Sequence, residues 1–263
     1  MNTHKFIAFI DVLGFKDLVE NNSHDNLVNF YERLFSSSVA VGLAKGQREF
    51  YTRDGKEYWQ PKYSEISVNS LIVSDSIIIW TNDTNMKSFI DLIVTVKITM
   101  SHSFNIGFPL RGAIVEGNLS SFKNVYNSKS DNSTNTLVGL GLVKAYKLEE
   151  EQDWSGCVIE DTCIETFEKL IISHKEKTPD VATVNDLINT GLIAKYKVPF
   201  KSGPLKEKYV INWITKKKDD VLLSEASMRK KFADYNKQVG DWKVEKIIKN
   251  TLDFVDHIKV TMK

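Results

Sequence analysis

Short runs rich in isoleucine, valine and aromatic residues alternate along the chain with longer segments whose apolar residues recur every three or four positions. The short runs predict strands, and the longer segments predict amphipathic helices. The predicted strands lie at residues 5–12, 66–73, 76–80, 108–117, 155–161, 193–200 and 208–214. The predicted helices lie within residues 18–34, 86–104, 137–154, 162–171, 224–238 and 241–259.

Turn and capping residues mark some of the boundaries. Only Ser74 and Asp75 separate the second and third predicted strands, which predicts a hairpin with these two residues at its tip. Asp83 or Thr84 is expected to cap the helix that follows the hairpin. Gly139 is expected to begin the helix that contains "LVKAYKLEEE".

The order of the predicted elements is β-α-β-β-α-β-α-β-α over the first two thirds of the chain. Hairpins mixed with crossovers indicate an α+β fold, and we predict a sandwich of the split βαβ, ferredoxin-like kind. Residues 45–64 lack a period and predict a loop or a flexible hairpin turning at "DG", and 127–135 predict a polar loop. No stretch is typical of a linker, so we predict one domain over residues 1–263. Its core spans about 5–165, and strand and helical additions follow from about 166 to 263.

Two acidic residues interrupt apolar runs. Asp11 lies within "KFIAFIDVL" and Asp75 between "LIV" and "IIIW". A charge in apolar surroundings is costly unless it is paired or bound to a metal. If the first strand and the hairpin are neighbours, the two carboxylates converge, and two divalent cations roughly 4 Å apart would let both stay ionised. The alternative for each residue is an ordinary cap or turn aspartate.

A glycine turn, "VLGFKDL", follows Asp11 and enters a predicted helix. Free backbone N–H groups at such a turn suit a phosphate group. Acid, glycine turn and helix start together indicate a metal-bound nucleoside triphosphate.

Charge and composition exclude several other classes of protein. The 35 basic residues nearly cancel the 34 acidic ones, which gives no sign of a protein that binds nucleic acid or a membrane surface. Cys157 and Cys163 match no zinc or redox spacing and are expected to be reduced packing residues. No apolar stretch reaches the length of a membrane span. We therefore expect a soluble cytoplasmic protein.

The motifs "FIDVLGF", "VSDSIIIW", "LRGAIVEG" and "TLVGLGLVKAYKLE" occur in the order found in class III nucleotidyl cyclase catalytic domains, which residues 5–165 resemble. The resemblance implies the palm-type cyclase sandwich and two Mg²⁺ or Mn²⁺ ions held by Asp11 and Asp75. It also implies phosphate binding near Gly14 and Phe15, and a homodimer with active sites between its subunits.

A narrower similarity extends over "VGLGLVKAYKLEEEQDWSGCVI", "YKVPF", "YVINW" and "NTLDF". These segments look like the pyrimidine cyclases of Pycsar antiphage systems. This likeness implies UTP or CTP as substrate, without indicating which, and cyclic UMP or cyclic CMP as product. It also implies a separate effector that responds to the cyclic nucleotide without stable contact.

The chain departs from the class III pattern at the residues that orient the ribose and read a purine. The Asn and Arg of the last catalytic helix align with Val143 and Lys147, and the purine-reading Lys and Asp align with Leu71 and Thr136. Lys147 could still contact a phosphate as a point charge, or it could be a solvated helix lysine. The changes at Leu71 and Thr136 argue against adenine recognition.

Two further residues have open interpretations. Arg111 enters an apolar strand and is expected either to contact phosphate or the second subunit, or to pair with a buried acid such as Glu116. Tyr146 either stacks on the base or, as we favour, is a core aromatic residue.

Two other functions compete with the cyclase. A palm polymerase or diguanylate cyclase shares the metal-binding strand and hairpin, but "VSDSI" lacks the acidic pattern of their hairpins. The second alternative is a degenerate cyclase-like domain that binds a nucleotide or a partner without turnover. Replacement of the Asn/Arg pair favours it, and retention of both aspartates opposes it.

Overall fold

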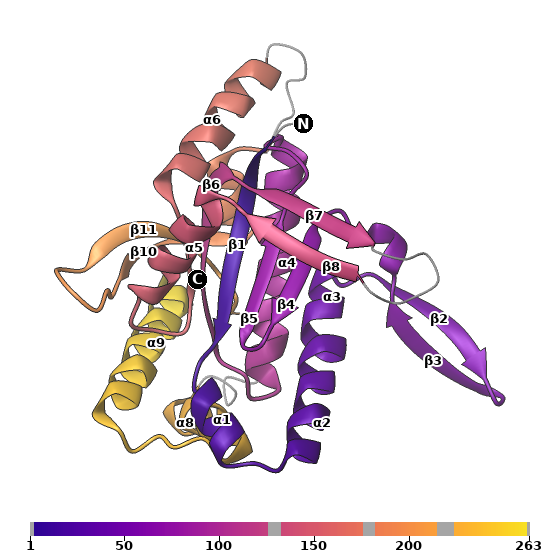
Figure 1. The fold of residues 1–263 in the computed structure, drawn as a ribbon. Coiled ribbons are helices and arrows are strands. Elements are labelled where there is room, and N and C mark those ends of the chain that lie inside the picture. Colours follow the sequence, from indigo (N-terminus) through magenta and orange to yellow (C-terminus); the bar gives the residue numbers. More distant parts are fainter. Residues whose placement is uncertain (1–2, 126–132, 176–181, 215–223, 262–263) are drawn as a thin grey trace.

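A computed structural model describes residues 3–125, 133–175, 182–214 and 224–261 (Figure 1). The strands are β1 His4–Val12, β2 Arg48–Arg53, β3 Lys56–Pro61, β4 Asn69–Val73, β5 Ser76–Trp80, β6 Leu110–Asn118, β7 Ser120–Val125, β8 Ser133–Val138, β9 Cys157–Ile159, β10 Ile193–Val198 and β11 Lys206–Ile211. The helices are α1 Phe15–Glu20, α2 His24–Leu34, α3 Ala40–Leu43, α4 Met86–Asn105, α5 Leu140–Glu150, α6 Asp161–Lys175, α7 Val184–Asn189, α8 Glu225–Ala233 and α9 Trp242–Thr261.

A seven-stranded sheet in the order β10-β11-β9-β6-β1-β5-β4 forms the centre of the molecule. β1 is antiparallel to both β5 and β6, and β4 is antiparallel to β5. The unit β1–α–β4–β5–α4–β6 therefore has the strand order and directions of a split βαβ fold. The predicted α+β, ferredoxin-like architecture is confirmed.

The two faces of β1 enter different hydrophobic cores. Phe6, Ala8 and Ile10 belong to the main core, which also takes residues from α4, α6 and α9. Ile7 and Phe9 belong to a smaller core that includes Ala145 of α5. Alternate residues of a strand point to opposite faces, so every odd position of β1 points to the α5 side.

The C-terminal additions extend the same sheet. β9 runs parallel to β6, and β11 and β10 continue the sheet beyond it. α9 packs against β10 through an aromatic cluster in which the Phe254 ring lies 4.8 Å from Trp154 and 5.0 Å from Tyr196. These additions thus share a core with the preceding part of the chain.

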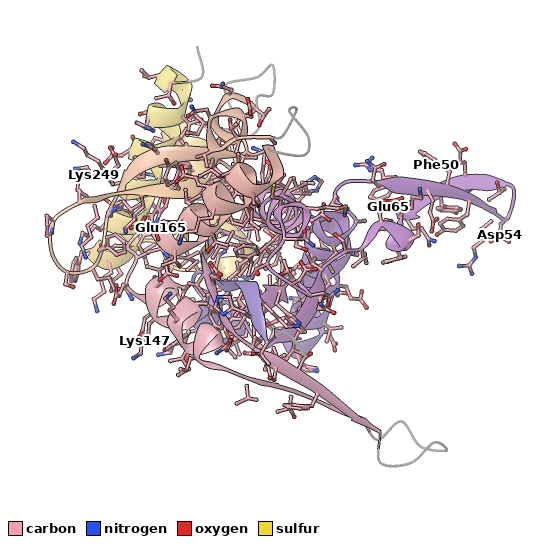
Figure 2. All side chains as sticks on the ribbon, turned by 90° about the horizontal axis from the view of Figure 1, so that it is seen from above. Phe50, Asp54, Glu65, Lys147, Glu165 and Lys249 are labelled. Atoms are coloured by element: carbon pink, nitrogen blue, oxygen red, sulfur yellow. The ribbon has the colours of Figure 1, made fainter. Side chains whose placement is uncertain are left out.

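Two hairpins stand apart from the sheet. β2 and β3 pair over residues 48–61, turn at Asp54–Gly55 and project from the body with exposed aromatic side chains such as Phe50 (Figure 2). The hairpin alternative for 45–64 is therefore confirmed. β7 and β8 form the second hairpin, which the sequence did not predict. The predicted loop at 127–135 lies largely outside the described residues, and its last three residues begin β8.

One predicted cap is wrong, and several smaller expectations are met. Asn85, and neither Asp83 nor Thr84, caps α4, because the Asn85 side chain accepts from Ser88 N at 2.8 Å. Gly139 precedes α5 as expected. Both cysteines are buried free thiols. Within the described ranges, no helix is both long enough and apolar enough to cross a membrane.

Candidate active site

Asp11 lies near the end of β1 on the α5 side of the sheet. Its partners in register are Ser76 of β5 and Arg111 of β6. Directly paired residues project to the same face of an antiparallel sheet, so the three side chains meet there. The Ser76 hydroxyl donates to Asp11 Oδ1 at 3.4 Å.

Asp75 is held beside the end of β1 by the hairpin. Ser74 and Asp75 form the turn between β4 and β5, and Ser74 takes a left-handed φ of 56°. The backbone N–H of Val12 donates to the Asp75 carbonyl oxygen at 3.1 Å. The hydroxyl of Tyr31, on α2, donates to the Ser74 carbonyl at 3.0 Å. The hairpin tip is thus tied to both β1 and α2, and its place beside β1 is the one that the sequence pattern predicts.

The surroundings of Asp11 disfavour its charged form. Burial, followed by the negative charges of Glu149 and Asp75, raises the pKa of Asp11 to about 7, while Arg111 and the Ser76 hydroxyl act in the opposite direction. Burial, followed by the charges of Asp75 and Asp11, also raises the pKa of Tyr31 to about 12. The pKa values of Asp11 and Tyr31 are therefore both raised by the negative charges at this end of the sheet.

This donor set fits a divalent cation that also binds phosphate. Mg²⁺ and Mn²⁺ use one or two protein carboxylates and complete their coordination with water and substrate phosphate oxygens. Asp11 and Asp75 supply two such carboxylates, and a cation between them would relieve their repulsion. In the described part of the chain, no three His, Cys, Asp or Glu side chains converge as a complete protein cage. The site fits an ion shared with a phosphorylated ligand.

The glycine turn after β1 lies at the same end of the sheet. Gly14 has a left-handed φ of 76° and precedes α1, a helix of only six residues. A Cβ at Gly14 would lie 3.0 Å from Lys237 Cδ. The Lys237 side chain therefore covers this turn. The Phe15 ring packs edge-on against Tyr31, with ring centroids 6.1 Å apart.

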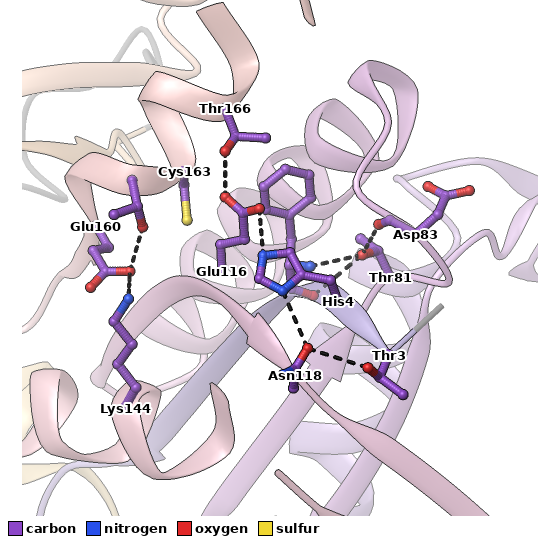
Figure 3. A network of polar contacts seen from close by, with 12 residues as sticks. Thr3, His4, Thr81, Asp83, Glu116, Asn118, Lys144, Glu160, Cys163 and Thr166 are labelled. Atoms are coloured by element: carbon purple, nitrogen blue, oxygen red, sulfur yellow. Dashed lines mark hydrogen bonds and ion pairs between the residues drawn. The ribbon is translucent and has the colours of Figure 1, made fainter. Parts of the chain in front are cut away.

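Arg111 forms a buried ion pair, although not with the acid expected from the sequence. Its Nε donates to Glu149 Oε1 at 2.5 Å, and its Nη1 donates to the Gln152 carbonyl at 3.1 Å. Glu116 is engaged elsewhere: it pairs with His4 at 2.7 Å and accepts from the Thr166 hydroxyl at 2.6 Å (Figure 3). Glu149 is a site residue that sequence reasoning missed.

The α5 side chains point in different directions. Tyr146 is 46% exposed and packs edge-on against Phe9 with ring centroids 5.6 Å apart, so the core position that the sequence favoured is wrong. Lys147 projects from the surface (Figure 2) and lines a pocket with Lys144 and Glu160. That pocket does not include Asp11 or Asp75 of the same chain.

Leu71 and Thr136, which align with purine-reading positions, line one pocket. It measures about 280 Å³ and lies between the β4–β5 and β7–β8 hairpins. The remaining lining residues are Asn69, Ser70, Trp80, Ser121, Phe122 and Leu137. Sequence reasoning missed Asn69, although its position two residues before Leu71 puts it on the same face of β4.

Comparisons with known proteins give structural similarity alone. No protein-family model and no curated protein matches the chain. The adenylyl cyclase CyaB from P. aeruginosa is 12% identical, with a TM-score of 0.45 over 82% of this chain and 96% of that chain. The dimeric guanylyl cyclase domain of the RhoGC fusion protein from Blastocladiella emersonii is 11% identical, with a TM-score of 0.48 over 80% and 96%. Similarity at this level establishes neither a family nor an activity for this chain.

Proposed function

We propose that this protein is a class III-like nucleotidyl cyclase that converts a pyrimidine nucleoside triphosphate to the 3′,5′-cyclic monophosphate and pyrophosphate. The observation that carries the proposal is the pair of carboxylates at one end of the sheet. Asp11 sits in surroundings that raise its pKa to about 7, with Asp75 beside it. Such an arrangement is costly in an inert domain and useful where a cation and a triphosphate bind together.

Each residue of the site has a defined task in this proposal. Asp11 and Asp75 would hold two Mg²⁺ or Mn²⁺ ions, which when bound supply charge neutralisation to the reacting phosphate and acidify the ribose 3′-hydroxyl. Ser76 and Arg111 favour the ionised form of Asp11. Backbone N–H groups at Gly14 and Phe15 would contact phosphate. Arg111 is held by its ion pair with Glu149. Its role is therefore to favour the charged form of Asp11 from a fixed position.

The pocket lined by Leu71 and Thr136 supports a single-ring base. Its volume of about 280 Å³ can hold a single-ring base, and Leu71 offers no polar group to a purine edge. The Asn69 amide nitrogen already donates to Asn82 Oδ1 at 2.8 Å and to the Trp80 carbonyl at 3.4 Å, which leaves its side-chain oxygen as an acceptor. Thr136 adds a hydroxyl that can donate to or accept from a uracil or cytosine edge. We therefore favour UTP or CTP over ATP or GTP.

A homodimer would complete the site. Apolar side chains are exposed on α5 and the β7–β8 hairpin, with 80% of Leu140, 56% of Val138 and 48% of Val143 accessible. An apolar surface of this kind suits a second copy of the chain. Lys147 lines a pocket that does not include the aspartates of its own chain; in the dimer it would reach the site of the partner subunit, next to a base stacked on Tyr146.

The resemblance to Pycsar cyclases supplies the biological part of the proposal. Cyclic UMP or cyclic CMP would act as a second messenger in antiphage defence and would activate a separate effector. The protein would act in the cytoplasm as one cyclase domain.

Product analysis tests the activity directly. Pure protein is incubated with each of the four nucleoside triphosphates and Mn²⁺, and the products are identified by mass. We expect cyclic UMP or cyclic CMP at a far higher initial rate than the purine products. Asp11→Asn and Asp75→Asn should each abolish turnover in a folded protein. A purine triphosphate as best substrate would refute the pyrimidine assignment, and activity in either variant at saturating metal would refute the two-aspartate site.

A second candidate function is binding without turnover. The observation that favours it is the Val143 and Lys147 pair in place of the Asn and Arg of active class III enzymes. In that case the same assay gives no product from any of the four substrates, while a nucleotide still binds in the presence of Mn²⁺.

A further inference from the structure

A cavity of about 440 Å³ lies between β6, the segment after α5 and the start of α9. Its volume falls in the range of ordinary small-molecule sites, about 300 to 1,000 Å³. The residues that matter here are Arg111, Asp153, Lys201, Trp242, Lys243 and Lys246. α9 belongs to the C-terminal additions and lies outside residues 5–165, which carry the sequence motifs that resemble class III cyclases, so those motifs do not account for this cavity.

Positive charge dominates the lining. Four cationic side chains face one carboxylate, Asp153. Two of the cations are already paired: Arg111 with Glu149 at 2.5 Å and Lys246 with Asp153 at 2.6 Å. Within the described ranges, neither Lys201 nor Lys243 lies within 4.0 Å of a carboxylate oxygen. The cavity therefore carries surplus positive charge in the absence of a ligand.

The start of α9 adds an aromatic ring to this cavity. Trp242 is the first residue of α9, a helix of 20 residues, and 68% of its surface is exposed. The N-terminus of a long helix carries a partial positive charge, and the Asp241 carboxylate offsets it here because it accepts from the Lys243 backbone N–H at 2.7 Å. A large exposed aromatic ring beside cations is an arrangement that accepts a base as well as a phosphate.

The cavity adjoins the acidic site through one residue. Arg111 lines the cavity and is also the register partner of Asp11. Its guanidinium is held in place by Glu149 and the Gln152 carbonyl. Arg111 is therefore close both to an anion in the cavity and to a cation at Asp11.

We infer that this cavity binds a polyphosphate anion, with Lys201 and Lys243 as its principal contacts. Isolated surface lysines attract anions weakly because solvent screens them. Here the lysines converge on a concave site together with a buried arginine. Two kinds of molecule carry such a polyphosphate group: a nucleoside triphosphate and free pyrophosphate.

Calorimetric titration with inorganic tripolyphosphate tests the site without turnover. EDTA is present, the ionic strength is fixed, and the intact chain is used. The double variant Lys201→Ala, Lys243→Ala is compared with the matched control Lys197→Ala, Lys249→Ala, which removes the same charge from exposed positions on β10 and α9. We expect saturable binding to the wild type, at least a tenfold weaker affinity in the first variant, and a change within twofold in the control.

Several outcomes would overturn the inference. These are the absence of saturable binding to the wild type, equal weakening in the two double variants, and UMP binding as tightly as UTP. Tighter binding of UTP than of pyrophosphate would assign the nucleotide triphosphate as ligand, and the reverse order would assign the released anion. Because EDTA excludes turnover, a negative result here is separate from failure of the proposed cyclase activity.

Discussion

Neutralising Asp11 should stabilise the metal-free protein at neutral pH. The pKa of Asp11 rises from 3.8 to about 7 in the folded state, a shift of about 3 units, which corresponds to about 4 kcal/mol at 1.36 kcal/mol per unit. The side chain is half-buried, so solvent screening reduces this to about 2–4 kcal/mol. An asparagine at this position has nearly the same size and carries no charge, so the Asp11→Asn variant avoids the cost.

The direction in which stability changes with pH follows from the protons bound at Asp11. Between pH 3.8 and about 7 the folded state binds more protons at Asp11 than the unfolded state does, so stability falls as pH rises through this window. The cost is absent below about pH 4 and complete above about pH 7. The free energy of unfolding of Asp11→Asn minus that of the wild type should therefore grow from near zero at pH 4 to about 2–4 kcal/mol at pH 8.

Urea unfolding in EDTA at pH 4, 6 and 8 measures this difference. Glu57→Gln, at an exposed position on β3, is the matched control and should show no comparable growth with pH. Adding Mn²⁺ at pH 8 should raise the stability of the wild type and not that of Asp11→Asn. A difference that stays constant with pH, or a destabilised Asp11→Asn protein at pH 8, would refute the crowded-carboxylate reasoning.

Three other predictions concern the buried pair, the dimer and a buried lysine. Arg111→Met should cost about 3–5 kcal/mol in urea unfolding because it leaves Glu149 buried and unpaired, and adding Glu149→Leu should recover most of it; equal losses would contradict this. Mixing inactive Asp75→Asn with inactive Lys147→Ala should restore some activity if the dimer shares its sites; a fully active monomer in light scattering would exclude that. Burial lowers the pKa of Lys97 to about 8, so wild-type stability should rise between about pH 8 and 10.5, and a Lys97→Met protein that shows the same rise would contradict the assignment.

The central fold could be predicted because its signals are local. Strand-like runs separated by only Ser74 and Asp75 allow little besides a hairpin, and the long amphipathic segment at 86–104 provides the crossover. The β7–β8 hairpin gave no such signal. Its strands contain several serine and asparagine residues, which favour turns over strands by propensity, and cross-strand pairing holds them in strands instead.

The ion-pair partner of Arg111 could not be identified from the alternation of side chains along its own strand. Glu116 is the nearest acid on the same strand, yet it lies five positions after Arg111, so the two side chains point to opposite faces. The period alone could have excluded this pairing. Identifying Glu149 needs the packing of α5 against β6, which no local pattern states, because the acid comes from a helix that also carries exposed charged neighbours.

The composition of the chain gave no sign of the basic cavity, because acidic and basic residues nearly cancel over the whole sequence. A net charge of +1 over 263 residues suggests no anion site, and Lys201, Lys243 and Lys246 are spread over two separate parts of the sequence. Screening limits each charge to about 8–10 Å at physiological salt, so only the charges that folding brings within that range determine the local potential. Balanced composition therefore excludes a uniformly charged surface, and it leaves open a concave site where four cations meet one carboxylate.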